Sequence, residues 1–268
     1  MQIYGLNDRG HPVKLLQRAL NEKLKRNLVC DGHLGRVTQA AILQYQEQQG
    51  IDEEDADGAC YGEKTQSSIG PFIEKRYLQE NDFEKAAKEL GVDIASVKAI
   101  TQVEAKEFGF LPNGFPVVLF ERHKFYQMLA KHRGAGLAAA MVNINPGVCN
   151  PQAGGYVGGA EEVKRLDTAR TIDETCAYLS ASYGLFQIMG FNYEACGFAN
   201  VHAFVDAMKR SEDDQLMAFV NFMKADKKLH SAVKDKDWTE VARRYNGPAY
   251  AKNQYDVKLA AAYSSFKG

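Results

Sequence analysis

The chain has 268 residues, 45% of them hydrophobic, which is enough to bury a substantial core in one or two domains. Its 33 lysines and arginines almost balance its 34 aspartates and glutamates. The resulting formal net charge of −1 argues against a protein that binds nucleic acid by neutralising phosphates. No run approaches the roughly 20 apolar residues that a membrane span needs, so we expect no membrane insertion.

The beginning of the chain and its cysteines bear on where the protein works. Residues 1–10 have neither the basic start nor the apolar stretch of a secretory signal peptide. We therefore expect the protein to be made in a cytosol and to need another route to any target outside the membrane. The five scattered cysteines form no Cys-x-x-Cys pair, which predicts reduced, mostly buried thiols. No His-Glu-x-x-His motif is present, and we expect no metal site.

A turn motif occurs twice in the first seventy residues. Residues 31–38 read DGHLGRVT, and residues 57–65 read DGACYGEKT. Each copy has Asp-Gly, a second glycine, and a threonine near an expected helix start. Glycine supplies positive φ angles, while Asp and Thr oxygens can accept hydrogen bonds from free backbone amides at a helix start. Two copies of one turn-helix unit predict a small, pseudo-symmetric helical bundle.

Apolar side chains at helical spacing surround the first copy. The residues before it are Val13, Leu16, Leu20 and Leu24, and we expect them to face a core. Val37, Ala41 and Tyr45 follow it in the same way, and Gly50 provides a C-cap. Further along, Gly70-Pro71 is expected to break a third helix or to begin a new one.

With Gly10-x-x-Val13-x-x-Leu16-Gln17-x-x-Leu20 ahead of it, this pattern resembles the peptidoglycan-binding-like domain found on many cell-wall hydrolases. The resemblance covers roughly residues 5–70. It implies a three-helix domain over residues 1–75 that binds peptidoglycan. The turns alone predict only helix caps, and the residues that would contact sugar or peptide stay open.

The next region places a carboxylate on an apolar helix face. Asp93 is a plausible N-cap for a helix over residues 94–106, and Val97, Ile100 and Glu104 share one face of it. A buried glutamate is rare unless it is paired or functional. Burial would raise its pKa, as a general acid working near neutral pH requires. The alternative is a rim residue in a salt bridge with Lys98, Lys106 or Arg122, and the rival acid is Glu107, which shares the face.

Two later segments add polar groups that could serve a site. Residues 182–190 read SYGLFQIMG, in which Gly184 permits a close backbone approach and Gln187 could hydrogen-bond a ligand or Glu104. We expect this segment to be a turn. Residues 245–248 read YNGP, which places Tyr245 and Asn246 beside a strong turn signal.

The order of these features, an acid on a helix, then Ser-x-Gly-Leu-x-Gln-Ile-Met, then Tyr-Asn, resembles the goose-type lysozyme and lytic transglycosylase superfamily. FLPNG at residues 110–114 and LFERH at residues 119–123 are similar to the N-acetylmuramidase family of phage endolysins. The resemblance implies a lysozyme-like helical catalytic domain over residues 80–268, with Glu104 as the acid. It implies that Ser182, Gln187, Tyr245 and Asn246 bind substrate. The chain departs from the superfamily at Ala105, where a serine is common.

A second catalytic carboxylate is an open question. Glycosidases commonly use two carboxylates, and their separation sets the stereochemistry of the product. Glu121, within the family-like LFERH segment, is our candidate, although an ion pair with Arg122 or a backbone cap would also explain it. Asp167 and Asp173 are weaker candidates. Lytic transglycosylases manage with one glutamate, since the 6-hydroxyl of the sugar attacks.

The expected fold is therefore mainly α: a small three-helix domain followed by a lysozyme-like helical domain. Two stripes support the helical reading of the C-terminal half, one through Leu216, Phe219, Val220 and Met223, the other through Val257, Ala260, Ala261 and Ser264. Only residues 115–120 suggest a short strand.

The expected function is hydrolysis of the β-1,4 bond between N-acetylmuramic acid and N-acetylglucosamine in bacterial peptidoglycan. The alternatives are a lytic transglycosylase that leaves 1,6-anhydro-muramic ends and a non-catalytic wall-binding protein. Acid-assisted glycoside cleavage needs no metal or organic cofactor, and a monomer suffices. The likeness to phage enzymes implies accumulation in the host cytoplasm and holin-dependent release to the periplasmic wall.

Overall fold

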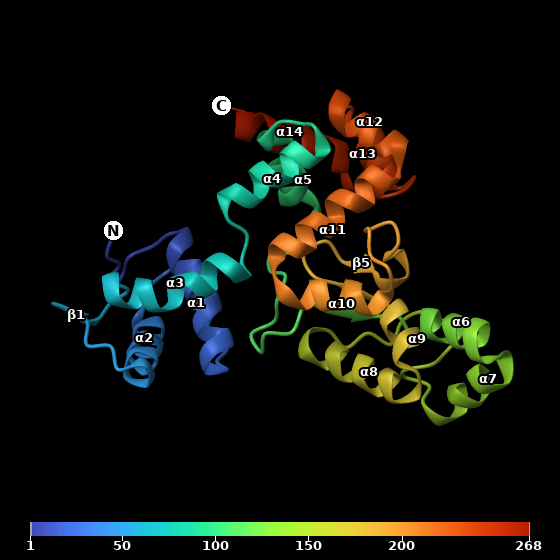
Figure 1. The fold of residues 1–268 in the computed structure, drawn as a ribbon, viewed down its shortest axis with the longest axis horizontal. Helices are drawn as coiled ribbons and strands as arrows, with labels where there is room; N and C mark the ends of the chain where they lie inside the picture. The colour runs from blue at the N-terminus through green and yellow to red at the C-terminus, as the bar shows by residue number, and fades with distance from the viewer. Residues whose placement is uncertain (1, 268) are drawn as a thin grey trace. The chain divides into compact units, whose positions relative to one another are not determined.

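The computed structural model describes residues 2–267, which form two compact units. The first unit comprises the chain up to Tyr77 together with Phe110–Phe115, and the second comprises Leu78–Gly109 and the chain from Pro116 onward. Helices dominate both units (Figure 1), so the prediction of a mainly α fold is confirmed.

Three helices make up most of the first unit: α1 (His11–Leu24), α2 (Arg36–Gln49) and α3 (Glu63–Arg76). A short antiparallel hairpin, β1 (Glu54–Asp55) with β2 (Gly58–Ala59), precedes α3. The core of the first unit contains the predicted apolar side chains Val13, Leu16, Leu20, Ala41 and Tyr45.

One expected core residue of α2 lies elsewhere. Val37 is 70% exposed, so its assignment to the core was wrong. The buried stripe of α2 runs instead through Thr38, Ala41, Ile42 and Tyr45, at the i, i+3, i+4 and i+7 spacing of one helix face. Gly50 does cap α2, with φ of 65°.

The two copies of the turn motif have the same pattern of internal hydrogen bonds. In the first, the side-chain amide of Gln17 donates to the carbonyl of His33 at 3.0 Å and to Thr38 Oγ1 at 3.1 Å. In the second, the amide of Gln46 donates to the carbonyl of Cys60 at 3.0 Å and to Thr65 Oγ1 at 2.9 Å. A buried glutamine therefore ties each turn to the helix that follows it, which confirms the predicted pseudo-symmetry.

Pro71 does not interrupt the third helix, contrary to the sequence-based expectation. It lies inside α3, and Ile69 and Ile73 on either side of it are both buried. A proline in a helix interior costs about 3 kcal/mol. Burying two isoleucine side chains contributes a comparable or larger amount, at about 1.5–3 kcal/mol each.

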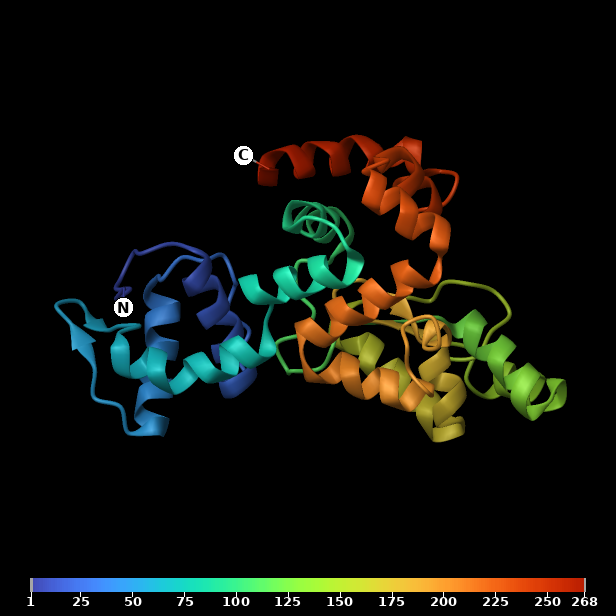
Figure 2. The same ribbon diagram turned by 45° about the horizontal axis from the view of Figure 1, so that its top comes forward.

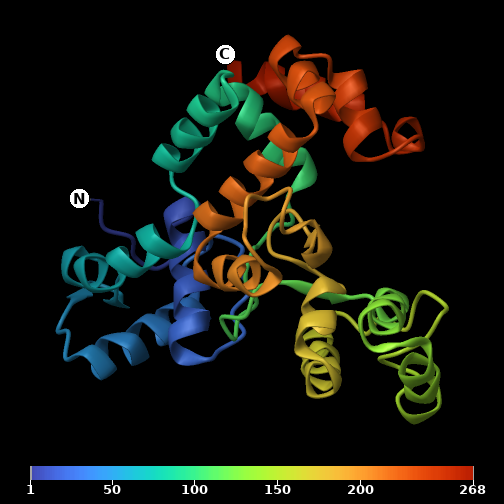
Figure 3. The ribbon, with the colours of Figure 1, turned by 45° about the vertical axis from the view of Figure 1, so that its right-hand side comes forward.

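The second unit begins with α4 (Glu80–Leu90) and α5 (Ile94–Glu104), and α5 packs against α4 and α14. Figure 2 shows α14, in red, alongside α5, in teal to green. The remaining helices are α6 (Arg122–Arg133), α7 (Ala135–Ile144), α8 (Gly159–Ile172), α9 (Glu174–Leu179), α10 (Val201–Arg210), α11 (Glu212–Ala225), α12 (Lys227–Asp235), α13 (Trp238–Tyr245) and α14 (Tyr255–Lys267). Figure 3 shows α6 and α7 as a helical hairpin at the edge of this unit.

A small antiparallel sheet lies within the second unit, in the order β3 (Val118–Phe120), β4 (Ala181–Tyr183) and β5 (Ile188–Met189). Strand β3 is the one the sequence suggested. The SYGLFQIMG segment, expected only as a turn, forms the hairpin of β4 and β5, in which Ser182 pairs with Met189.

Of the two helical stripes predicted for the C-terminal half, one is confirmed and the other is wrong. Leu216, Phe219, Val220 and Met223 of α11 are all buried, as predicted. The stripe proposed for α14 is wrong, because Val257 is 59% exposed while Leu259 and Ala262 are buried. None of the five cysteines forms a disulfide within the described chain. Within the described residues, every helix falls short of the length and apolarity needed to cross a membrane.

Phe110 generates a test of this division into units. Its side chain is 5% exposed in the core of the first unit, with the Arg76 guanidinium 3.4 Å from the ring centroid. Replacement of a buried Phe by Ala typically costs about 3–5 kcal/mol. We expect Phe110→Ala to lower the free energy of unfolding by that amount and to speed amide exchange in α1 and α3. Exposed Ile3 provides the control: Ile3→Ala should change stability by less than about 0.5 kcal/mol. Faster exchange confined to the second unit would contradict the assignment.

Candidate active site

Glu104 is the last residue of α5. Asp93 begins the helix by accepting the Ser96 amide at 2.8 Å, and Val97 and Ile100 bury the face on which Glu104 lies. The helix ends there, two residues before the predicted end, and its C-terminal carbonyls disfavour a nearby negative charge. Burial raises the pKa of Glu104, partly offset by a hydrogen bond from Asn246.

That hydrogen bond is the direct partner of the carboxyl group. Asn246 Nδ2 donates to Glu104 Oε2 at 2.9 Å. Glu104 Oε1 and Asn246 Oδ1 are both buried and have no hydrogen-bond partner among the described residues. The expected alternative, a rim salt bridge, is wrong, because Glu104 makes no ion pair in the described chain and Lys98 pairs with Glu80. The acid therefore offers one unsatisfied oxygen.

The turn of the β4–β5 hairpin holds the two partners of this bond together. The carbonyl of Leu185 accepts the amide of Lys106, just after Glu104, at 2.7 Å. The carbonyl of Phe186 accepts the hydroxyl of Tyr245, just before Asn246, at 3.4 Å. Tyr245 packs edge-on against Phe219, with ring centroids 5.3 Å apart. Burial and then the charge of Glu104 raise the pKa of Tyr245, which keeps its hydroxyl neutral.

Ser182 and Gln187 shape this turn. Ser182 Oγ donates to Gln187 Oε1 at 3.1 Å, and Gln187 Nε2 donates to the carbonyls of Gly184 at 2.8 Å and Val117 at 3.2 Å. Gln187 has φ of 48°, a strained value for a non-glycine residue. The two side chains thus bond to each other and to the backbone rather than to Glu104. Their contact with substrate stays a prediction.

Two buried residues of α11 hold backbone near the site, Gln215 at the same turn and Glu212 at Gly109, and sequence reasoning missed both. Gln215 Oε1 accepts the Leu185 amide at 2.8 Å, and a Cβ on Gly184 would lie 2.5 Å from the Gln215 side chain, so only glycine fits there. Glu212 Oε1 accepts the Gly109 amide at 2.9 Å. A signal was available: Glu212 lies one helical turn before Leu216, and Gln215 one turn before Phe219. Both continue the apolar stripe, as Glu104 does on α5.

Glu121 lies at the N-cap of α6, but neither expected structural role applies. Its Oε2 accepts the Tyr156 hydroxyl at 2.8 Å and lies 3.1 Å from His123 Nδ1, while its side chain caps no amide. Arg122 instead donates to loop carbonyls.

The sheet separates Glu121 from the turn. Val117, whose carbonyl accepts the Gly184 amide, precedes β3, and Glu121 follows it. Four residues of strand span about 13 Å.

The other acidic candidates have structural partners, as does the glycine-rich loop before α8 (residues 145–158). Asp167 pairs with Arg170, and Asp173 caps α9 and pairs with Arg133. Glu162, also missed from the sequence, is fully buried and accepts the amides of Val157, Gly158 and Phe120. Among residues 2–267, no group of three or more His, Cys, Asp or Glu side chains could hold a metal ion.

Comparison with known proteins agrees with this geometry. A family model described as N-acetylmuramidase matches residues 93–267. The crystal structure of the Burkholderia AP3 phage endolysin is 42% identical, and the match covers 99% of each chain with a TM-score of 0.68. A search of curated proteins returns no match. With its family model spanning α5 to α14, the chain belongs to the N-acetylmuramidase family.

Proposed function

We propose that this peptidoglycan hydrolase cleaves the β-1,4 bond between N-acetylmuramic acid and N-acetylglucosamine, with Glu104 as its general acid. The observation that supports the proposal is the half-buried carboxyl of Glu104, with Oε2 held by Asn246 and Oε1 unsatisfied. General acid catalysis by a positioned side chain typically contributes about 10²–10⁴-fold in rate.

The two oxygens of Glu104 have different tasks in this mechanism. Because Asn246 Nδ2 donates to Oε2, the proton of the neutral carboxyl belongs on Oε1. Oε1 then protonates the glycosidic oxygen as the bond to the anomeric carbon breaks. The carboxylate that results can take a proton from the attacking nucleophile. That nucleophile is water in a muramidase and the 6-hydroxyl of the muramic acid in a lytic transglycosylase.

The transglycosylase reading remains the second candidate, because within residues 2–267 no carboxylate other than Glu104 is bonded to Asn246 or Tyr245. Digestion of purified peptidoglycan, borohydride reduction and mass spectrometry of the soluble fragments distinguish the two. We expect reducible muramic-acid ends. Anhydro-muramic ends would instead establish the transglycosylase, and release of peptides alone would exclude both.

Replacement of the acid has two opposite effects. We expect Glu104→Gln to lower lytic activity by about 10²–10⁴-fold, since the amide cannot donate the proton. Because the pKa of Glu104 is raised in the folded state, protonation of Glu104 stabilises the fold at low pH. This contribution to stability is lost as the pH rises through the folded pKa. Glutamine removes this loss, so the melting temperature near neutral pH should rise. Calorimetry and turbidity assays measure the two effects.

Two matched variants accompany this test. Exposed Glu107→Gln should retain activity, and its inactivity with an intact fold would show that the wrong acid has been named. Glu121→Gln tests the candidate second carboxylate. An unchanged rate would remove Glu121 from the mechanism, whereas a loss comparable to that of Glu104→Gln would assign it a direct role.

The Asn246 bond predicts a pH shift. Its donation to the carboxylate lowers the pKa of Glu104, so Asn246→Ala should raise that pKa further. The acid must be protonated to act, and the alkaline limb of kcat against pH should therefore move to higher pH while the maximum falls. Asn143→Ala, on the exposed face of α7, should leave the profile unchanged. An alkaline limb that moves to lower pH would refute the assigned role of Asn246.

We also propose that the first unit binds peptidoglycan, on the resemblance of its paired turns to wall-binding domains. The inactive Glu104→Gln chain should pellet with purified sacculi, and the sacculi should slow amide exchange in α1 to α3. If sacculi slow amide exchange only in the second unit, the first unit does not bind peptidoglycan and serves as a spacer.

For the route to the wall, we propose accumulation in the host cytoplasm and release by a holin, in a monomeric form that needs no nucleic acid. The similarity to a phage endolysin supports this route. Cells that express the chain should lyse only when a holin is co-expressed, and the purified protein should sediment at 29.8 kDa.

A further inference from the structure

Helix α7 has no charged face and yet lies largely in solvent. None of its ten residues is charged, and only Ala138 among them is buried. Leu137 and Ile144, seven positions apart and so on one face of the helix, are 39% and 64% exposed. A helix with so few polar side chains is ordinarily buried in a protein core or in a membrane. Within the described chain, α7 has far less cover than its composition predicts.

The neighbour that holds α7 in place is α6. The two helices pack against each other and form a helical hairpin at the edge of the second unit (Figure 3), with Gly134 between them. Phe125 and Leu129 of α6 are buried in the core of that unit, so α6 anchors the hairpin. Because α7 packs on α6 from outside the core, its own side chains stay exposed.

The hairpin is also cationic. Residues 122–160 contain no aspartate or glutamate, although acidic residues are frequent elsewhere in the chain. Helix α6 ends with Lys131, His132 and Arg133, which are all exposed and directly precede α7. Of these three, only Arg133 forms an ion pair in the described chain, with Asp173 at 2.6 Å. Lys131 therefore presents its charge to solvent beside an apolar helix.

Aromatic side chains add to the apolar surface at the other end of the hairpin. Arg122, at the start of α6, donates to the carbonyl of Pro146, just after α7, at 3.4 Å, so these two ends adjoin. Exposed Phe191 lies with its ring centroid 5.8 Å from Lys124 Nζ, and exposed Tyr156 bonds to the N-cap residue of α6. Lysines beside exposed aromatic rings are typical of surfaces that meet a lipid interface.

These features match one kind of partner, a bilayer of anionic phospholipids. Cations are attracted to the lipid phosphates, and apolar side chains enter the boundary between head groups and acyl chains. The glycan strands of the wall offer mainly hydroxyl and amide groups, which would leave Leu137 and Ile144 without apolar contact. A partner protein with an apolar surface would cover these two side chains but gives no reason for a cationic segment without acids.

We propose that the α6–α7 hairpin binds the surface of an anionic phospholipid bilayer. Leu137 and Ile144 enter the interface, while Lys124 and Lys131 contact phosphate groups. With ten residues, α7 is about 15 Å long, half the thickness of a hydrocarbon core, so it lies on the bilayer and does not cross it. Such binding keeps the enzyme at the membrane that borders its wall substrate, and it needs no part of the Glu104 site.

The test is co-sedimentation of the full chain with sucrose-loaded vesicles. We expect binding to vesicles of phosphatidylethanolamine and phosphatidylglycerol, weaker by about tenfold for phosphatidylcholine alone and weakened by high salt. The anionic vesicles should also slow amide exchange in α7. Equal binding to both kinds of vesicle, binding to neither, or slowed exchange confined to other helices would overturn the proposal.

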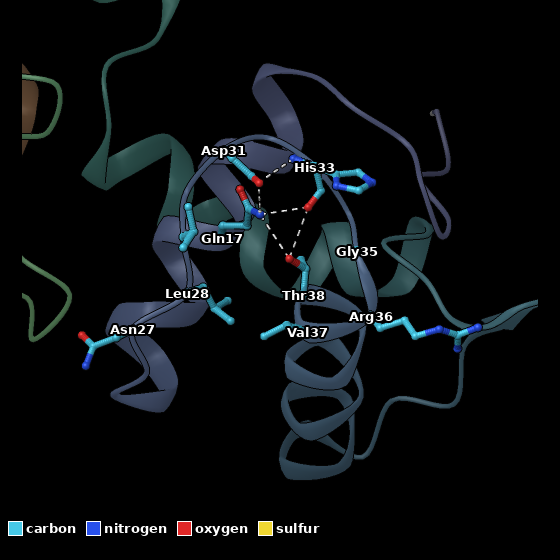
Figure 4. A pocket seen from close by; sticks show the side chains of 10 residues that line it. Gln17, Asn27, Leu28, Asp31, His33, Gly35, Arg36, Val37 and Thr38 are labelled. Atoms are coloured by element: carbon cyan, nitrogen blue, oxygen red, sulfur yellow. Dashed lines mark hydrogen bonds between the residues drawn. The ribbon is translucent and has the colours of Figure 1, made fainter.

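Single substitutions assign the contacts. Ile144→Ser removes an apolar group from the interface and should weaken binding about tenfold. Lys131→Gln removes one cation and should weaken it about fivefold. Because both side chains are exposed, the melting temperature should change little. Val37, strongly exposed beside a pocket of the first unit (Figure 4), provides the control, since Val37→Ser should bind vesicles as the unaltered chain does. Unchanged binding in both Ile144→Ser and Lys131→Gln would refute the assigned surface.

Failure here is distinguishable from failure of the proposed catalytic role. The Glu104→Gln chain should bind vesicles as tightly as the unaltered chain, so the named acid can be wrong while membrane binding stands. Sedimentation velocity separates the remaining occupant. If vesicles do not bind and the chain forms dimers that Ile144→Ser abolishes, the exposed face of α7 serves a second copy of this chain and the proposal is wrong.

Discussion

The active-site region of this N-acetylmuramidase depends on one pair of backbone carbonyls. At the tip of the β4–β5 hairpin, the carbonyl of Leu185 accepts the backbone amide of Lys106, just after Glu104. The carbonyl of Phe186 accepts the hydroxyl of Tyr245, just before Asn246. Residues more than 140 positions apart thereby meet in one hydrogen bond, at Glu104 Oε2. The tip can serve both because Gln215, buried in α11, accepts its Leu185 amide from the other side. The placement of Glu104 and Asn246 is thus fixed by backbone carbonyls of the tip rather than by its side chains.

Much of this arrangement could be predicted from the sequence, since apolar periodicity identifies buried helix faces. Val97, Ile100 and Glu104 lie on one face as expected, and the burial of that face raises the pKa of the acid. Asn246 was expected near the site, but its bond to Glu104 was not, since spacing along a chain contains no information about contacts between distant segments. Glu212 and Gln215 were missed because the stripe of α11 was read only for apolar residues.

Other errors have local physical causes. Val37 fits a helical stripe but lies in the first turn, where the bundle does not cover it. Pro71 carries a strong breaking signal, yet neighbouring isoleucines bury enough surface to keep α3 continuous. The partners of Glu121 could not be predicted, because Tyr156 reaches it from a glycine-rich loop 35 residues away. The loop in turn is held by Glu162, a charge that hydropathy reading assigns to the surface.

The two copies of the turn motif in the first unit differ in how the helix that follows each one begins. Glu53 closes the start of α3 with two short hydrogen bonds, and such a cap is worth about 0.5–2 kcal/mol. Among the described residues no side chain caps the start of α2, so that helix forgoes this stability. A domain of some seventy residues has little stability to spare. With one copy contributing rigidity, the other is free to diverge, so sequence change can accumulate at the start of α2 without unfolding the domain.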